Sequence, residues 1–139
     1  RVSDEPWASW DYLPTTLELS GTKAPADLKT DGISLASFLQ GGPAPKRDYF
    51  YWELHEGQSI QAARWGDWKA VRNGPAAKVE IYDLKVDANE KSDLADKRPE
   101  LVEKALAIFK DAHVDHPEWP MRSQKQMQDV NKARKKDSK

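Results

Sequence analysis

Hydrophobic positions along this chain follow two different periods, and the change falls near residue 46. Before it, apolar residues recur three or four positions apart, which is typical of one helix face: Trp10, Leu13 and Leu17, and then Leu35, Phe38 and Leu39. Ser9 is a suitable cap for the first of these helices, and Gly21 suits its end. We therefore predict two short helices joined by loops within residues 1–45, followed by a domain boundary.

After the boundary, apolar and polar residues alternate with a period of two, which is typical of strands. The alternation predicts four strands, over residues 49–54, 59–64, 68–72 and 79–84. Gly66 lies between the second and the third, where a tight hairpin needs a positive φ angle. Because the connections are short and parallel pairing needs long crossovers, the strands should form one antiparallel sheet.

An amphipathic helix is expected to begin at Pro99, since the first helical position needs no amide donor. Its apolar stripe has to cover another apolar surface, and one face of the sheet offers it; the stripe consists of Leu101, Val102, Ala105, Leu106, Ile108, Phe109 and Ala112. The predicted fold class of residues 46–115 is therefore α+β: a four-stranded antiparallel sheet packed against a C-terminal amphipathic helix.

Residues 116–139 carry a basic surplus, with seven Lys and Arg against two Asp between positions 121 and 139. Few aromatic or branched apolar residues accompany these charges, so we expect an extended, disordered tail. Binding of a polyanion by the tail is an alternative. It predicts an affinity that falls with salt and on truncation after Pro120.

Composition narrows the classes of protein further. The chain has 139 residues and no cysteine, which excludes disulfides, thiolate catalysis and zinc–thiolate sites. No segment approaches the ~20 consecutive apolar residues of a membrane span, so no membrane partner is expected. With 22 basic and 23 acidic residues, the net charge of −1 gives no reason to expect nucleic acid. Because it starts at Arg1 rather than Met, the chain is expected to be cut from a longer precursor.

Four motifs follow one another in a specific order. They are W-D-Y-L-P-T at residues 10–15, D-G-I-S at 31–34, R-W-G-D-W-K at 64–69 and I-Y-D-L-K-V-D-A-N-E at 81–90. Together they resemble the C-terminal portion of the type I sulfatases, the arylsulfatase family of the alkaline-phosphatase-like superfamily. Ala88 departs from the family pattern, which usually has proline there.

The resemblance implies that residues 1–45 are a remnant of the large α/β domain of a sulfuric ester hydrolase and that 46–115 are its C-terminal subdomain. A formylglycine nucleophile and a calcium ion belong to the missing N-terminal catalytic domain. This chain has no Cys/Ser-x-Pro-x-Arg motif to supply the first, so we expect no catalytic residue, metal ligand or cofactor in it. Alone it should be an inactive scaffold that forms, at most, one wall of a cleft for sulfated glycan. The family also implies a periplasmic or secreted protein.

Glu53 and His55 are the first candidates for contact with substrate, because the subdomain borders the active-site cleft in the arrangement that the resemblance implies. The alternatives are a solvated carboxylate for Glu53 and a structural hydrogen bond for His55. His113 and His116 are three positions apart, but Pro117 directly follows them. We expect these two histidines to be exposed rather than to form a metal pair on a helix.

Arg64 and Trp65 are the other candidates for contact with substrate. A guanidinium group can hold a sulfate with two hydrogen bonds, and an indole ring can stack on a sugar. The alternatives are an ion pair from Arg64 to Asp67 or Asp83 and a packing role for the tryptophan.

A stand-alone carbohydrate-binding module is the alternative function, because six tryptophans are many for a chain of this length. Burial of Trp52, Trp65 and Trp68 would exclude it, whereas two or more coplanar rings on the solvent side would favour it. A further expectation is self-association. Residues 1–45, separated from a larger domain, would present apolar surface to a second copy.

Overall fold

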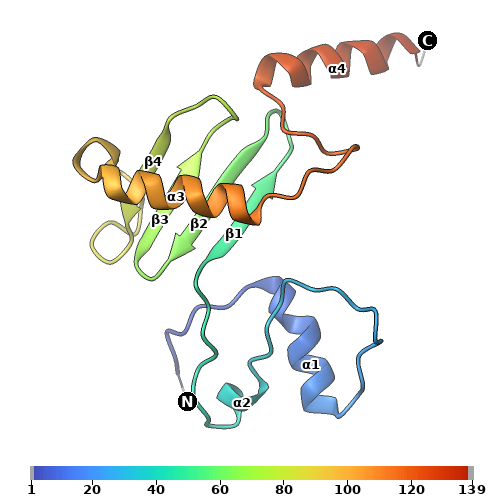
Figure 1. Ribbon diagram of the computed structural model, residues 1–139, viewed down its shortest axis with the longest axis vertical. Coiled ribbons are helices and arrows are strands. Elements are labelled where there is room, and N and C mark those ends of the chain that lie inside the picture. Colours follow the sequence, from blue (N-terminus) through green and yellow to red (C-terminus); the bar gives the residue numbers. More distant parts are fainter. Residues whose placement is uncertain (1, 138–139) are drawn as a thin grey trace. The chain divides into compact units, whose positions relative to one another are not determined.

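The structure, a computed structural model, describes residues 2–137 and divides into two compact units between Asp48 and Tyr49. Residues 1, 138 and 139, which belong to the expected remnant and tail, lie outside the described part. Among the described residues, no helix combines the length and the apolar character that crossing a membrane requires. Figure 1 shows the elements of both units.

The first unit is helical, as its hydrophobic period predicts. It contains a 3-10 turn, η1 (Ser9–Asp11), which leads into α1 (Tyr12–Ser20), and a one-turn helix, α2 (Ala36–Leu39). Gly21 ends α1 with a φ angle of 66°, and its N–H group bonds back to the last turn. The helix therefore ends at the residue that the sequence indicated.

Asp11 organises this unit, although its side chain is fully buried. One carboxylate oxygen accepts the N–H of Ala8 at 2.8 Å, and the other accepts the N–H of Ile33 at 3.0 Å. The second oxygen also pairs with the guanidinium of Arg47. Ser9, the cap expected from the sequence, makes no side-chain capping bond, and Asp11 satisfies the start of η1 instead.

Thr15 makes a second tie between the same segments. Its hydroxyl donates to the carbonyl of Asp11 at 2.6 Å and accepts the N–H of Leu35 at 3.0 Å. Gly32 lies where the chain passes close to η1, because a Cβ atom there would be 2.1 Å from the carbonyl oxygen of Trp10. The first two sequence motifs therefore bind each other within one unit.

The second unit contains the predicted sheet. Its strands are β1 (Phe50–Leu54), β2 (Ile60–Trp65), β3 (Trp68–Arg72) and β4 (Val79–Asp83), paired antiparallel in that order (Figure 1). Gly66 has a φ angle of 56° in the hairpin between β2 and β3. All four strands lie within one residue of their predicted bounds, and the α+β fold class is confirmed.

Helix α3 (Pro99–Ala112) follows η2 (Ala95–Lys97) and covers one face of the sheet (Figure 1). The strand register aligns Ala63, Ala70 and Ile81 on that face, and all three are fully buried. Their small side chains let the helix approach the strands closely. The core consists of Ala63, Trp65, Ala70, Val79, Ile81, Ala105, Ile108 and Phe109.

Helix α4 (Gln124–Asp137) occupies most of the range in which we expected an extended tail. Ser123 accounts for its start, since the N–H of Ser123 donates to the side chain of Gln126 at 2.8 Å and the hydroxyl accepts the N–H of Gln126 at 3.4 Å. Glutamine, lysine, arginine and alanine dominate the helix, and all are good helix formers. Met127 is buried against the rest of the unit. Residues 113–123, in contrast, form no helix or strand.

Candidate functional site

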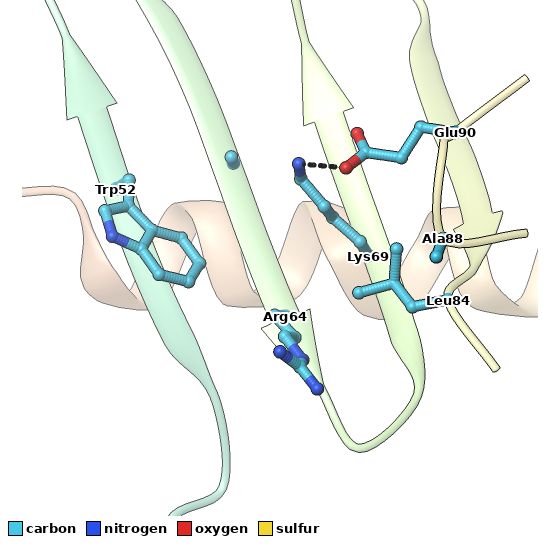
Figure 2. Close-up of a pocket in the computed structure, with 7 residues that line it drawn as sticks. Trp52, Arg64, Lys69, Leu84, Ala88 and Glu90 are labelled. Carbon is cyan, nitrogen blue, oxygen red and sulfur yellow. Dashed lines mark hydrogen bonds and ion pairs between the residues drawn. The ribbon is translucent and has the colours of Figure 1, made fainter. Parts of the chain in front are cut away.

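The third and fourth sequence motifs meet on the face of the sheet that α3 leaves uncovered. Lys69 of β3 donates to the carboxylate of Glu90 at 2.6 Å (Figure 2). Asp87 shapes the turn that carries Glu90, because its carboxylate accepts the N–H groups of Lys91 and Ser92, each at 2.8 Å. Two main-chain hydrogen bonds to Asp87 therefore hold this turn, which has alanine at position 88.

A hollow of about 590 Å³ lies on this face, between Trp52, Arg64 and the Lys69–Glu90 pair (Figure 2). Arg64 donates from Nε to the carbonyl of Gly66 at 3.3 Å. Within residues 2–137 no carboxylate pairs with Arg64, so the ion pair expected with Asp67 or Asp83 is not formed.

Trp65 lies on the opposite face from Arg64, because successive strand residues alternate between faces. It is only 6% exposed and packs in the core, with the ammonium of Lys104 5.5 Å from the centre of its ring. The structure therefore does not bring these two candidates together. Burial leaves Trp65 no face for a sugar to stack on.

The other two tryptophans of the sheet do not form a platform either. Trp52 is 38% exposed on the uncovered face, whereas the strand register directs Trp68 to the helix side. Trp68 is half-buried, and the guanidinium of Arg98 lies 5.7 Å from the centre of its ring. Three rings on two faces, one of them buried, do not favour a carbohydrate-binding module.

Glu53 lies at the centre of a polar cluster at the end of β1, which we call the Glu53 cluster (Tyr51, Glu53, His55, Gln61 and His113). Its carboxylate accepts hydrogen bonds from the hydroxyl of Tyr51, from Nδ1 of His113 at 2.6 Å and from Nε2 of Gln61 at 3.2 Å. Nε2 of His55 lies 3.3 Å from its second oxygen. The carboxylate is therefore bound within the protein rather than free in solvent.

Hydrogen bonds outweigh burial in setting the charges of this cluster. Burial would raise the pKa of the Glu53 carboxyl, but the donors Tyr51 and His113 hold this pKa below its ordinary value of 4.5. Burial would likewise lower the pKa of His113, whereas its hydrogen bonds to Glu53 and Asp115 raise this pKa above 6.5. Between pH 4.5 and pH 6.5 the Glu53 carboxylate and the His113 ring are therefore both charged.

His55 is held on both sides. Nδ1 of its ring lies 2.9 Å from the hydroxyl of Ser59, and Nε2 faces Glu53. These contacts connect Ser59, His55 and Glu53 in space, and a serine, a histidine and a glutamate connected in this order have the composition of a catalytic nucleophile with its base. Ser59 is fully buried, however, and its hydroxyl already accepts the N–H of Arg122 at 2.8 Å. No substrate atom can reach this hydroxyl, so the connection is structural.

Sequence reasoning missed three members of this region, Ser59, Gln61 and His113. The expectation that His113 is exposed was wrong, since the side chain is 20% exposed and makes an ion pair with Glu53. His113 is sixty positions from Glu53, and no local pattern links them. Gln61 could have been found, because it lies directly opposite Glu53 once the hairpin is aligned.

Comparison with solved structures finds sulfatases. A protein from Bacteroides thetaiotaomicron VPI-5482 that is assigned as a sulfatase is 30% identical to this chain, with a TM-score of 0.65, over 73% of this chain and 23% of its own. A 2-O GAG sulfatase is also 30% identical, with a TM-score of 0.64 and the same coverage. The chain belongs to the sulfatase family. It spans about a quarter of the length of the proteins that it matches.

This sulfatase portion also resembles Ps i-CgsB in complex with k-i-k-neocarrahexaose, at 22% identity and a TM-score of 0.65 over 84% of this chain and 27% of the other, which shows the fold alone. No model of a known protein family matches it, and no curated protein does. The described residues contain no group of three or more His, Asp or Glu side chains that could hold a metal ion. They therefore do not fit the calcium ion that the family implies.

Proposed function

We propose that this chain is the C-terminal part of a sulfuric ester hydrolase and serves it as a scaffold and as one wall of the substrate cleft. The observation that carries the proposal is the likeness to sulfatases at 30% identity, over 73% of this chain but only 23% of the longer protein. The formylglycine and the calcium ion would come from the remaining catalytic domain. By the same likeness, the whole protein would act in the periplasm or outside the cell.

The Glu53 cluster is the part of the chain that we propose for the wall. It lies where β1, the start of β2 and the end of α3 converge, so three segments hold its side chains in place. Both oxygens of Glu53 and both ring nitrogens of His55 are engaged within the protein. Such a surface would shape a cleft and orient a sugar, and it would not take part in breaking the ester bond.

A chimera tests the scaffold role. The matched quarter of the Bacteroides thetaiotaomicron protein is replaced by the corresponding part of this chain, and sulfate release from a sulfated disaccharide is measured. We expect release by the folded chimera and none by the 139-residue chain alone. Release of sulfate by the isolated chain would overturn the proposal.

Two matched variants of the chimera test the wall. Glu53→Gln should raise KM and leave kcat nearly unchanged, because a wall binds ground state and transition state alike. Glu103→Gln makes the same chemical change on the exposed side of α3 and should change neither constant. Equal KM values for the two variants would rule out a wall at Glu53 and leave the scaffold role untouched.

A further inference from the structure

Residues 113–123, which join α3 to α4 (Figure 1), form a segment that we call the strap. At its start, Nδ1 of His113 bonds to the carboxylate of Glu53 on β1 at 2.6 Å. Near its end, Arg122 accepts the N–H of Ser59 at its carbonyl oxygen and donates its own N–H to the Ser59 hydroxyl, both at 2.8 Å. The strap has no regular structure of its own, but it is therefore fastened to the sheet at two points.

One chain of side-chain contacts joins the two fastenings. The second oxygen of Glu53 lies 3.3 Å from Nε2 of His55, and Nδ1 of that ring lies 2.9 Å from the hydroxyl of Ser59. Because this hydroxyl accepts the N–H of Arg122, its own hydrogen is available to Nδ1 of His55. The ring hydrogen of His55 is then assigned to Nε2, which donates it to Glu53. With this assignment every hydrogen in the chain of contacts has an acceptor.

The charge of His113 decides how many hydrogen bonds the start of the strap can make. A charged imidazole donates from both nitrogens, and Nε2 of this ring faces the carboxylate of Asp115, a strap residue, at 3.0 Å. A neutral ring has only one N–H, so one of the two carboxylates would then face a bare nitrogen. Loss of one proton therefore weakens the first fastening and removes the positive charge that is paired with Glu53.

Other titratable or charged side chains surround the pair of Glu53 and His113. They are Tyr51 of β1, His55 after β1, Arg72 of β3, which reaches the pair through Gln61, Asp111 of α3, which bonds to Tyr49, and Asp115 of the strap. Burial and the hydrogen bond to Glu53 raise the pKa of Tyr51 above its ordinary value of 10.0. Carboxylate and guanidinium groups are charged throughout the range in which an imidazole titrates. The imidazole rings are therefore the groups of this region that respond to a change of pH near neutrality.

We propose that His113 is a catch for the strap: while its ring is charged the strap lies against the sheet, and when the ring loses its proton the strap and the start of α4 detach from a sheet that stays folded. Met127, in the first turn of α4, is only 9% exposed, so the start of this helix is packed and moves with the strap. The residues of the hydrophobic core all lie on the strands and on α3. Detachment of the strap therefore leaves the core intact.

The direction of the effect follows from proton linkage. Burial lowers the pKa of His113, but the hydrogen bonds to Glu53 and Asp115 outweigh it and raise this pKa above 6.5. The charged ring therefore stabilises the closed strap below pH 6.5, and this stabilisation is lost as the pH rises through the pKa that His113 has in the closed strap. Between these two pH values the equilibrium constant for opening should rise about tenfold per pH unit, because opening releases one proton.

Amide hydrogen exchange of the 139-residue chain tests the catch, with each rate expressed as protection relative to an unstructured peptide at the same pH. The N–H groups of Ser59 and Arg122 should lose protection together above pH 6.5, about tenfold per pH unit. The N–H of Leu94 bonds to the carbonyl of Ile81 at 2.8 Å and reports opening of the sheet. It should stay better protected than the other two amides at every pH.

Two variants and one direct measurement separate His113 from the other rings. His113→Gln cannot be charged, so Ser59 and Arg122 should have the same low protection at every pH. His116→Gln, at an exposed position, should keep the dependence on pH. In the unaltered chain, the ¹⁵N signals of the imidazole rings should show that the loss of protection ends at the pKa of His113.

Three results would each overturn the catch. The first is protection of Ser59 and Arg122 equal to that of Leu94 at every pH, because the strap would then open only when the sheet does. The second is a dependence on pH that survives in His113→Gln. The third is a loss of protection that ends at the pKa of His55, and this comparison within the unaltered chain decides the matter even if His113→Gln does not fold. The scaffold role is tested separately, because these measurements need no catalytic domain.

Discussion

An Asp11→Asn variant should destabilise the first unit by about 2–4 kcal/mol. The change preserves the shape of a fully buried side chain and removes its charge. In the native chain the two carboxylate oxygens accept the N–H groups of Ala8 and Ile33 and pair with Arg47. An amide has only one accepting oxygen, so its NH₂ group has to face one of these donors.

The magnitude follows from those partners. A buried N–H group left without an acceptor costs about 1–3 kcal/mol. The guanidinium of Arg47 is 15% exposed and loses its charged partner, which adds about 1 kcal/mol once screening by solvent is considered. Small domains are stable by only about 5–15 kcal/mol, so the loss is a large fraction of the total.

Amide hydrogen exchange measures this effect locally. The N–H groups of Ile33 and Leu35, which bond to Asp11 and Thr15, should exchange faster by the factor that corresponds to the lost free energy. Asp31→Asn makes the same chemical change at an exposed position of the same unit and should leave exchange unaltered. Equal protection of these amides in the two variants would refute the role assigned to the buried carboxylate.

Three other changes have expected outcomes. Gly32→Ala places a Cβ atom 2.1 Å from a main-chain carbonyl oxygen and should destabilise the first unit by about 1–3 kcal/mol in chemical denaturation, whereas unchanged stability would contradict this close approach. Phe109→Ala empties a site that is 2% exposed and should cost the second unit about 3–5 kcal/mol, and a loss below 1 kcal/mol would show that the core is not packed around this ring. The lowered pKa of Glu53 contributes stability that is present above pH 4.5 and is lost as the pH falls through the pKa that Glu53 has in the folded protein. The raised pKa of His113 contributes stability that is present below pH 6.5 and is lost as the pH rises through the pKa that His113 has in the folded protein. Unfolding midpoints measured from about pH 2 to 9 should therefore fall on both sides, His113→Gln should flatten the alkaline decline, and His116→Gln, at an exposed position, should not.

Alternation of apolar residues was sufficient to predict the sheet, because each strand buries one face against α3 and exposes the other. The same rule could have separated Arg64 from Trp65, since neighbours on a strand point to opposite faces. Treating both as one candidate site overlooked that periodicity. Trp65 is in the core for the same reason that Ala63 is, namely that both lie on the helix side of β2.

The Glu53 cluster could be predicted only in part. Gln61 lies opposite Glu53 in the ladder, so the hairpin register contains this contact. His113 reaches the cluster only because α3 runs across the sheet and ends beside β1, and such a tertiary arrangement has no signature in a local stretch of sequence. The tail was misjudged for another reason. Low hydrophobicity outweighed helix propensity in the prediction, although a capping serine and a run of good helix formers were both present.

Evolutionary drift around α1 is constrained unevenly. Asp11 and Thr15 bind the main-chain N–H groups of Ala8, Ile33 and Leu35, which every residue except proline possesses. Substitutions at positions 8, 33 and 35 therefore leave these bonds intact, whereas a change at Asp11 or Thr15 removes them. A homologue can replace most of the surrounding side chains and still keep the hydrogen bonds that Asp11 and Thr15 make to the main chain. Positions 11 and 15 should therefore tolerate fewer substitutions than positions 8, 33 and 35, because one carboxylate and one hydroxyl accept hydrogen bonds from main-chain N–H groups.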